Sequence, residues 1–192
     1  MKSLYLVLDM ENDLVHTDGP SGKSPMGALV VSRKIVSLTA AAIARARAAG
    51  VMIGFVRVGF SADYKECPPS SPVFSPARQN GLFKLGGWGA EIHPDLPVKP
   101  EDIQVVKHRV SPFYSTNLEV QLRAKGIERI YCSGVSTQAV VQATVRDGHD
   151  RDYEMIVLED CCAAHSDTEH ANSIGSLGRF CKVENSQTVV FG

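Results

Sequence analysis

The sequence lacks the features that mark three classes of protein. Its 192 residues contain no run near the roughly 20 apolar residues that a membrane helix needs. Charge of one sign is not in excess, with 20 Lys and Arg against 21 Asp and Glu, so the clustered positive charge of nucleic-acid binding is missing. Hydrophobic residues make up 44%, enough to offset the entropy lost on folding, which excludes intrinsic disorder. The expected partner is a small molecule, not nucleic acid or a membrane.

The cysteines lack any framework spacing. No two of the five form the Cys-x-x-Cys pair of zinc or thioredoxin sites, so reduced thiols are expected. The apolar run at the N-terminus stops at Asp9, and no cleavage site of a signal peptide follows it. A cytoplasmic location is therefore predicted. The cysteines are Cys67, Cys132, Cys161, Cys162 and Cys181.

What is present is an alternation of short apolar strands with amphipathic helices, and no linker or repeat, so residues 1–192 are expected to form one domain. This alternation predicts an α/β fold, a three-layer α/β/α sandwich around a mainly parallel, Rossmann-like sheet. Seven of the ten prolines lie between Pro68 and Pro100, which indicates a long irregular excursion over residues 59–100 that serves as a lid or wall. Strands are expected at 4–8, 51–58, 103–106, 129–133, 154–158 and 188–191, and helices at 28–49, 116–125, 137–150 and 168–177.

Chemistry is expected where strands end, because ligands of such folds bind beyond the carboxyl ends of the strands. Asp9 follows the first strand and Lys107 follows the third. A carboxylate and an ammonium in one pocket would tune each other's pKa for proton transfer, although a structural ion pair or two separate surface charges fit equally. Gly134 to Thr137 joins a strand to a helix. Its free amides could hold an oxyanion, or the turn could simply be a good N-cap made by Ser136 or Thr137.

Four ordered segments carry a family resemblance. They are Leu6-Val7-Leu8-Asp9-Met10-Glu11-Asn12-Asp13; Lys107-His108-Arg109-Val110-Ser111-Pro112-Phe113 with Thr116 and Leu118; Gly134-Val135-Ser136-Thr137 with Thr144; and Val157-Leu158-Glu159-Asp160-Cys161-Cys162-Ala163. Together they resemble the isochorismatase-like hydrolases, the cysteine hydrolase superfamily, over nearly the whole chain. The resemblance implies that family's α/β fold, Asp9 and Lys107 as catalytic residues, and a homo-oligomer, dimer or tetramer. Glu11 stands where glutamine is commoner.

The same resemblance exposes a missing nucleophile. The position of the family's reactive cysteine holds Val140, which has no lone pair and cannot form a thioester. None of the five cysteines falls there. Cys132 or Cys67 could approach the pocket, but a buried structural thiol is the expectation for Cys132.

Metal ligands are missing as well. Nicotinamidase-type members carry Asp-x-His after the second strand, where this chain has residues 56–60 without imidazole or carboxylate. His165, Asp167 and His170 are better explained by the start of a helix. We expect no metal and no cofactor.

The remaining site residues are implied by the resemblance or proposed from residue type. In thiol members, the peptide before the position of Ser136 is cis, and the amides of that residue and of the nucleophile form an oxyanion hole, which implicates Val135 and Ser136. Arg57, Trp88, Phe113 and Tyr114 are candidates for the substrate-binding wall. The planar guanidinium of Arg57 could bind a carboxylate, and a buried pair with Asp or Glu is equally open.

Three interpretations of function follow. In the first, the protein is a thiol-independent hydrolase in which Asp9 and Lys107 act on a small metabolite, in a vinyl-ether or related C–O or C–N hydrolysis. The characteristic Gly-Val-Tyr-Ala-His turn of isochorismatases proper is not present in this chain. In the second, the protein is a catalytically silent binding member of the family. In the third, Val140 is an engineered replacement, although Ala or Ser is the usual choice for that purpose.

Overall fold

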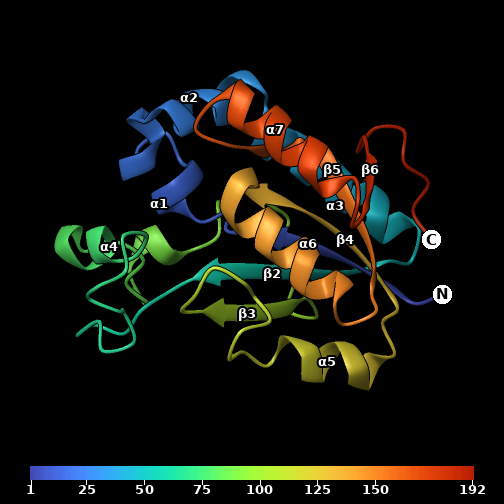
Figure 1. Cartoon of the computed structure of the whole chain (residues 1–192), viewed down its shortest axis with the longest axis horizontal. Coiled ribbons are helices and arrows are strands. Elements are labelled where there is room, and N and C mark those ends of the chain that lie inside the picture. Colours follow the sequence, from blue (N-terminus) through green and yellow to red (C-terminus); the bar gives the residue numbers. More distant parts are fainter.

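A computed structural model describes all 192 residues, and its centre is one six-stranded sheet (Figure 1). The strand order is β3-β2-β1-β4-β5-β6, and every neighbouring pair is parallel. Helices cover both faces, so the predicted three-layer α/β fold is confirmed. The strands are β1 (Ser3–Leu8), β2 (Met52–Val58), β3 (Ile103–Lys107), β4 (Arg129–Val135), β5 (Glu154–Ala163) and β6 (Lys182–Glu184).

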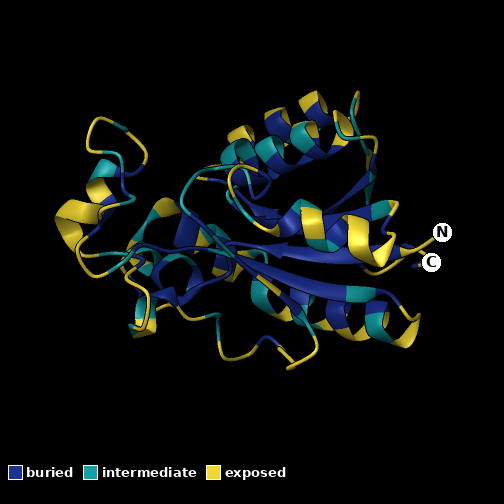
Figure 2. Ribbon diagram, turned by 90° about the horizontal axis from the view of Figure 1, so that it is seen from below, coloured by how far each residue is buried: buried dark blue, intermediate teal, exposed yellow.

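Two helical layers sandwich the sheet. Helices α2 and α3 pack against one face, and α5, α6 and α7 against the other. Figure 2 shows buried strands in the middle and helices whose exposed residues lie on their outer surfaces. No single helix is long and apolar enough to cross a membrane, and α2 with α3 meets that criterion only as a pair bent by 52°. The helices are α1 (Asn12–Val15), α2 (Pro25–Ser32), α3 (Ile35–Ala48), α4 (Ser75–Asn80), α5 (Leu118–Lys125), α6 (Gln142–His149) and α7 (Asp167–Leu177).

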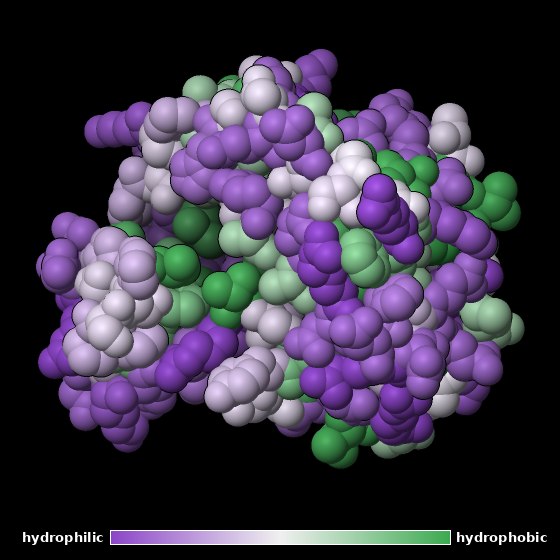
Figure 3. Space-filling model, in the orientation of Figure 1, coloured by the Kyte–Doolittle hydropathy of each residue, from purple (hydrophilic) through white to green (hydrophobic).

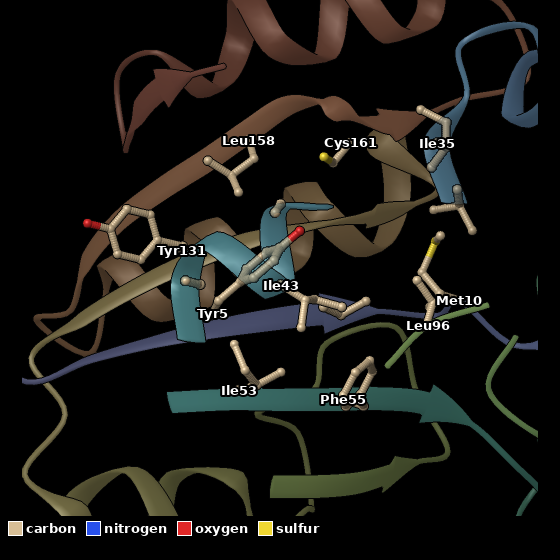
Figure 4. Close-up of a cluster of buried hydrophobic side chains, with 14 of the residues drawn as sticks. Tyr5, Met10, Ile35, Ile43, Ile53, Phe55, Leu96, Tyr131, Leu158 and Cys161 are labelled. Atoms are coloured by element: carbon tan, nitrogen blue, oxygen red, sulfur yellow. The ribbon is translucent and has the colours of Figure 1, made fainter. Parts of the chain in front are cut away.

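The alternation of side chains along β1 explains the two cores. Tyr5 and Val7 point into the core beneath α3, where Figure 4 shows Tyr5 beside Ile43. Leu4 and its alternate neighbours point into the core beneath α5 and α6. Both faces of β1 are buried, which is why its sequence is a continuous apolar run and not an alternating one.

Three predicted elements have different bounds or regularity in the structure, and a fourth is absent. The helix expected at 28–49 is divided into α2 and α3, because Lys34 adopts a left-handed conformation with φ of 56° and turns the chain. The helix expected at 137–150 begins as a π-helical turn, Thr137–Val141, before α6. Strand β5 continues to Ala163 after a register shift against β4.

The prediction of a strand at 188–191 is wrong. The sixth strand is β6, and the terminal segment instead packs on the core without pairing to the sheet. Val189 and Phe191 are buried there, and Arg45 donates a hydrogen bond to the Val189 carbonyl at 2.8 Å.

The excursion between β2 and β3 is folded around its own aromatic residues. It contains α4 and a single 3₁₀ turn, Trp88–Ala90, and it extends to the left in Figure 1. Phe60, Phe74 and Phe83 form a small third core with Val58 at the end of β2. This core holds the excursion beside the carboxyl ends of the strands, where it forms one wall of the site.

Candidate active site

The ends of β1 and β3 bring Asp9 and Lys107 together. Asp9 is the first residue after β1, and its N–H donates to the Val56 carbonyl at 2.9 Å. Lys107 is the last residue of β3 and donates a hydrogen bond from Nζ to Asp9 Oδ2 at 2.7 Å. Asp9 has a left-handed φ of 51°, a conformation that Asp tolerates better than most residues. The two side chains form a buried ion pair across the intervening β2.

Burial competes with the ion pair in setting the protonation of Asp9. Burial raises the pKa of the Asp9 carboxyl more than the charge and hydrogen bond of Lys107 lower it. Oδ1 of Asp9 is buried and has no hydrogen-bond partner, whereas Oδ2 is bonded to Lys107. A raised pKa favours the protonated form that a general acid requires.

A second carboxyl, which the sequence analysis did not include among the site residues, belongs to the same cluster. Glu11 is fully buried, and its Oε1 accepts a hydrogen bond from the Val58 N–H at 3.2 Å. Burial and the neighbouring Asp9 raise the pKa of Glu11 well above its ordinary value. The signal that could have found it is a second carboxyl only two residues after Asp9, beyond the carboxyl end of the same strand.

The turn after β4 forms another part of the site. Gly134 has a φ of 140°, and a Cβ atom at this position would overlap the Leu8 carbonyl oxygen, so only glycine fits. The Val135–Ser136 peptide bond is cis. Neither of the predicted N-caps forms, because the Ser136 hydroxyl makes no cap bond and Thr137 Oγ1 bonds His170 Nδ1 at 2.9 Å.

These elements surround a cavity of about 230 Å³. Figure 3 shows hydrophobic side chains gathered in a hollow beside the carboxyl ends of the strands. Val140 lines the cavity together with Asp9 and Lys107. The polar lining residues are Asp9, Ser21, Lys107, Ser136 and His165, and the apolar ones are Leu14, Met26, Val58, Val73, Phe74, Phe83, Val110, Val135, Ala139 and Val140.

The four residues predicted for the pocket wall lie elsewhere, and none lines this cavity. Arg57 donates from Nη1 to the Ala90 carbonyl at 2.8 Å and makes no ion pair with a carboxylate. Trp88 is half exposed, with its ring edge-on to His16. Phe113 is buried in stacking contact with Tyr153, and Tyr114 is 60% exposed. The walls come instead from α1, α2, the excursion, the loop after β3 and the turn after β4.

No cysteine lines the cavity. Cys132 is fully buried in the core beneath α5 and α6, and Cys67 is buried in the small aromatic core, where its thiol bonds the Phe74 carbonyl. Burial raises the pKa of Cys161 to about 12 and that of the half-buried Cys181 to about 11. A raised thiol pKa leaves little of the nucleophilic thiolate at neutral pH.

No group of three or more His, Cys, Asp or Glu is arranged to hold a metal ion. Two of the polar residues noted after β5 have other bonds. His165 Nδ1 lies 2.6 Å from Gln138 Nε2, and His170 Nε2 contacts Arg33 and Glu159. Both histidines therefore support the turn after β4.

The comparisons with known proteins agree with this architecture. The isochorismatase domain model matches residues 3–188, and the chain belongs to the isochorismatase family of hydrolases. It is 33% identical over 159 residues to the isochorismatase family protein YecD of Escherichia coli O157:H7, covering 82% of each chain.

Two further relatives are named for reactions at C–N bonds. The chain is 31% identical over 170 residues to the ureidoacrylate amidohydrolase RutB of Enterobacter sp. (strain 638), covering 82% of this chain and 74% of that one. The crystal structure of N-carbamoylsarcosine amidase from Thermoplasma acidophilum is 27% identical, with a TM-score of 0.78 over 98% of this chain and 99% of that one.

Proposed function

We propose that this protein hydrolyses a C–O or related C–N bond of a small molecule through Asp9 and Lys107, without a thiol. The observation that carries the proposal is the buried Asp9–Lys107 pair facing a cavity in which Val140 occupies the turn. Valine cannot add to a carbonyl, whereas a buried carboxyl beside an ammonium can still transfer a proton.

In this route Asp9 protonates the substrate at the atom that faces it. For a vinyl ether this atom is the terminal enol carbon, and water then adds to the resulting cation. Lys107 stabilises the carboxylate that Asp9 becomes, since its Nζ already bonds Oδ2. The backbone amides of the turn after β4 offer a place for a substrate oxygen or carboxylate.

The walls favour a substrate that is mostly apolar. Ten of the fifteen lining residues are hydrophobic, and no arginine is among them. A polyanionic substrate would therefore leave charge without a partner, which is costly in a cavity of this kind. The relatives named as an amidohydrolase and an amidase support including small amides beside uncharged vinyl ethers among the compounds to be screened. Isochorismate, which carries two carboxylates, is the polyanionic comparison.

The test of the proposal is Asp9→Asn, assayed on whichever compound of that panel the wild type hydrolyses. Loss of a general acid is expected to lower turnover on the order of 100- to 10,000-fold. The exposed Asp18→Asn, which also removes one carboxylate, is the matched control and should keep full turnover. Full activity of a folded Asp9→Asn protein would overturn the proposal.

A silent binding protein is the second candidate. The observation that favours it is the apolar side chain of Val140 on the cavity wall, at the position where the sequence resemblance implies the family's reactive cysteine. This alternative predicts that a panel compound raises the melting temperature without being consumed. Hydrolysis of the compound that binds would exclude it.

A further inference from the structure

Glu11 is enclosed in the protein and makes no ion pair. It precedes α1, its backbone bridges to Ile92, and its side chain is 0% exposed. Oε1 accepts the Val58 N–H, while Oε2 is buried without a hydrogen-bond partner. A buried carboxylate with one bond and no cation against it is costly, and taking up a proton removes that cost.

The charges that face Glu11 come from three strand ends. Asp9 follows β1, Lys107 ends β3, and Arg57 lies in β2. Lys107 is hydrogen-bonded to Asp9, and Arg57 is turned toward the Ala90 carbonyl. Asp13, the next acid along the chain, has its own donor in the Phe83 N–H at 2.7 Å. The cluster thus holds two buried carboxyls around a single ammonium.

The pKa of Glu11 is raised, as the presence of two carboxyls around one ammonium leads one to expect. Burial raises it most, and the neighbouring Asp9 raises it further. Lys107, the Val58 N–H and Arg57 lower it by less. Burial raises the pKa of both carboxyls, but Lys107 is bonded to Asp9 and opposes the effect there, whereas Glu11 makes no ion pair. In the resting site the shared proton therefore rests on Glu11, and Asp9 receives it when it acts as the acid.

We propose that Glu11 is a neutral carboxylic acid at physiological pH and gives the Asp9–Glu11–Lys107 cluster the one transferable proton that the thiol-independent reaction needs. The catalytic use of this proton rests on the proposed function, whereas its presence on Glu11 does not. Glu11 does not line the cavity, so it acts through Asp9 as a positioning residue and does not touch the substrate.

The proton balance for a vinyl ether closes within the cluster. The O–H bond of Glu11 breaks as its proton passes to Asp9. The new O–H bond of Asp9 then breaks, its electron pair stays on the Asp9 carboxylate, and a C–H bond forms at the enol carbon. Water then forms a C–O bond to the cation and returns one proton to the cluster. The hydroxyl proton of the resulting hemiketal passes to the leaving oxygen as its C–O bond breaks. Without Glu11, Asp9 would be the only carboxyl of the cluster left to hold the proton, and it would hold it against the opposing effect of Lys107.

The presence of the proton is tested on the substrate-free protein with Glu11→Gln. Glutamine keeps the volume and an oxygen that can accept the Val58 N–H, and it imitates the neutral acid. The infrared C=O band of a protonated carboxylic acid at neutral pH is expected in the wild type and absent from Glu11→Gln. The exposed Glu91→Gln is the control and should retain the band. A wild type without the band, or a band that survives Glu11→Gln, overturns the proposal.

The same variants give a second readout through the pH dependence of melting. A raised pKa in the folded protein means that the stability from protonated Glu11 is fully present below the ordinary Glu pKa and is lost as pH rises through the folded value. Glu11→Gln cannot titrate, so its melting temperature relative to wild type should rise across that range. Parallel curves for the two proteins would contradict a proton on Glu11.

The use of the proton is tested by kinetics. Glu11→Gln is expected to lower kcat on the order of 100-fold with KM unchanged, and to remove the alkaline limb of the wild-type pH profile. An unchanged kcat and pH profile would overturn the role of Glu11 even where the infrared band is present. Failure of the proposed function is seen separately, as full turnover by Asp9→Asn.

Discussion

The floor of the cavity, formed by the ends of β1 and β3 and by the turn after β4, has two sides that are held in place by different interactions. On one side, Asp9, Glu11 and Lys107 are ionisable groups enclosed at the ends of β1 and β3. On the other, the turn after β4 presents the apolar side chain of Val140 and is held by hydrogen bonds between neutral groups. We therefore expect that changing a charged residue disturbs both the fold and the proposed chemistry, and that changing Val140 has little effect on the fold.

This difference follows from where the energy lies. A buried ion pair is expensive to break, because the partner left behind is an uncompensated charge in protein. A hydrogen bond between neutral side chains is worth less, and an apolar residue of similar volume can be exchanged at small cost. The predicted effects therefore decrease from the charged side of the cavity to the turn.

The largest effect on stability is expected for Lys107→Met. Methionine keeps the apolar stem but leaves Asp9 without its cation, which should lower the free energy of unfolding by about 3–5 kcal/mol near neutral pH. That corresponds to roughly 10 °C in melting temperature for a chain of this size. The deficit should shrink at low pH, where Asp9 takes up a proton. Urea unfolding of wild type and variant at several pH values measures this.

The control for that variant is Lys99→Met, because Lys99 is half exposed and pairs only loosely with the exposed Glu101 at 3.9 Å. Its removal should change stability by about 0.5 kcal/mol or less. Equal losses for the two lysines would show that the buried pair is no more important to the fold than a surface contact.

An intermediate effect is expected for Thr137→Val on the turn. The variant removes the buried 2.9 Å hydrogen bond to His170 and leaves that ring nitrogen without a partner. The expected loss is about 1–3 kcal/mol, measured by urea unfolding beside the exposed Thr168→Val. A loss as large as that of Lys107→Met would mean that the turn depends on this bond as strongly as the ion pair depends on its lysine.

The sequence allowed one side of the cavity floor to be predicted much better than the walls. Asp9 and Lys107 were found because each lies at the carboxyl end of a strand, and the carboxyl ends of parallel strands meet at one edge of a sheet. Apolar runs likewise predicted the sheet itself. The prediction of a strand at the terminal segment failed, because Val189 and Phe191 are apolar side chains that pack on the core and do not belong to a strand.

The walls could not be predicted because no periodicity governs the excursion. Its path is fixed by contacts such as that between Phe60 and Phe74, neither of which belongs to a helix or strand. In the loop after β3, Val110 faces the cavity while Phe113, three residues on, turns into the core beneath α5. Residue type alone favoured the aromatic side chain of Phe113 for the wall, but the path of the backbone places the aliphatic side chain of Val110 there.

The smallest effect on stability, and the largest on chemistry at the turn, is expected for Val140→Cys. The two side chains are close in volume, so the loss should stay below about 1.5 kcal/mol. The new thiol would face Lys107 from the start of a helix, two conditions that lower a thiol pKa. One additional thiol should therefore be alkylated rapidly by iodoacetamide at neutral pH. Hydrolysis of small amides by this variant alone would show that an amidase frame persists around Val140.

The matched control is Val141→Cys, because Val141 belongs to the same turn but is fully buried in the core and does not line the cavity. Its thiol should be alkylated slowly, as should the native cysteines buried in the sheet. Equal reactivity of the two new thiols would mean that the turn, and not the cavity with its ion pair, sets the chemistry at these positions. Rapid alkylation of the thiol at position 140 alone would show that the cavity with its Asp9–Lys107 ion pair makes this position reactive.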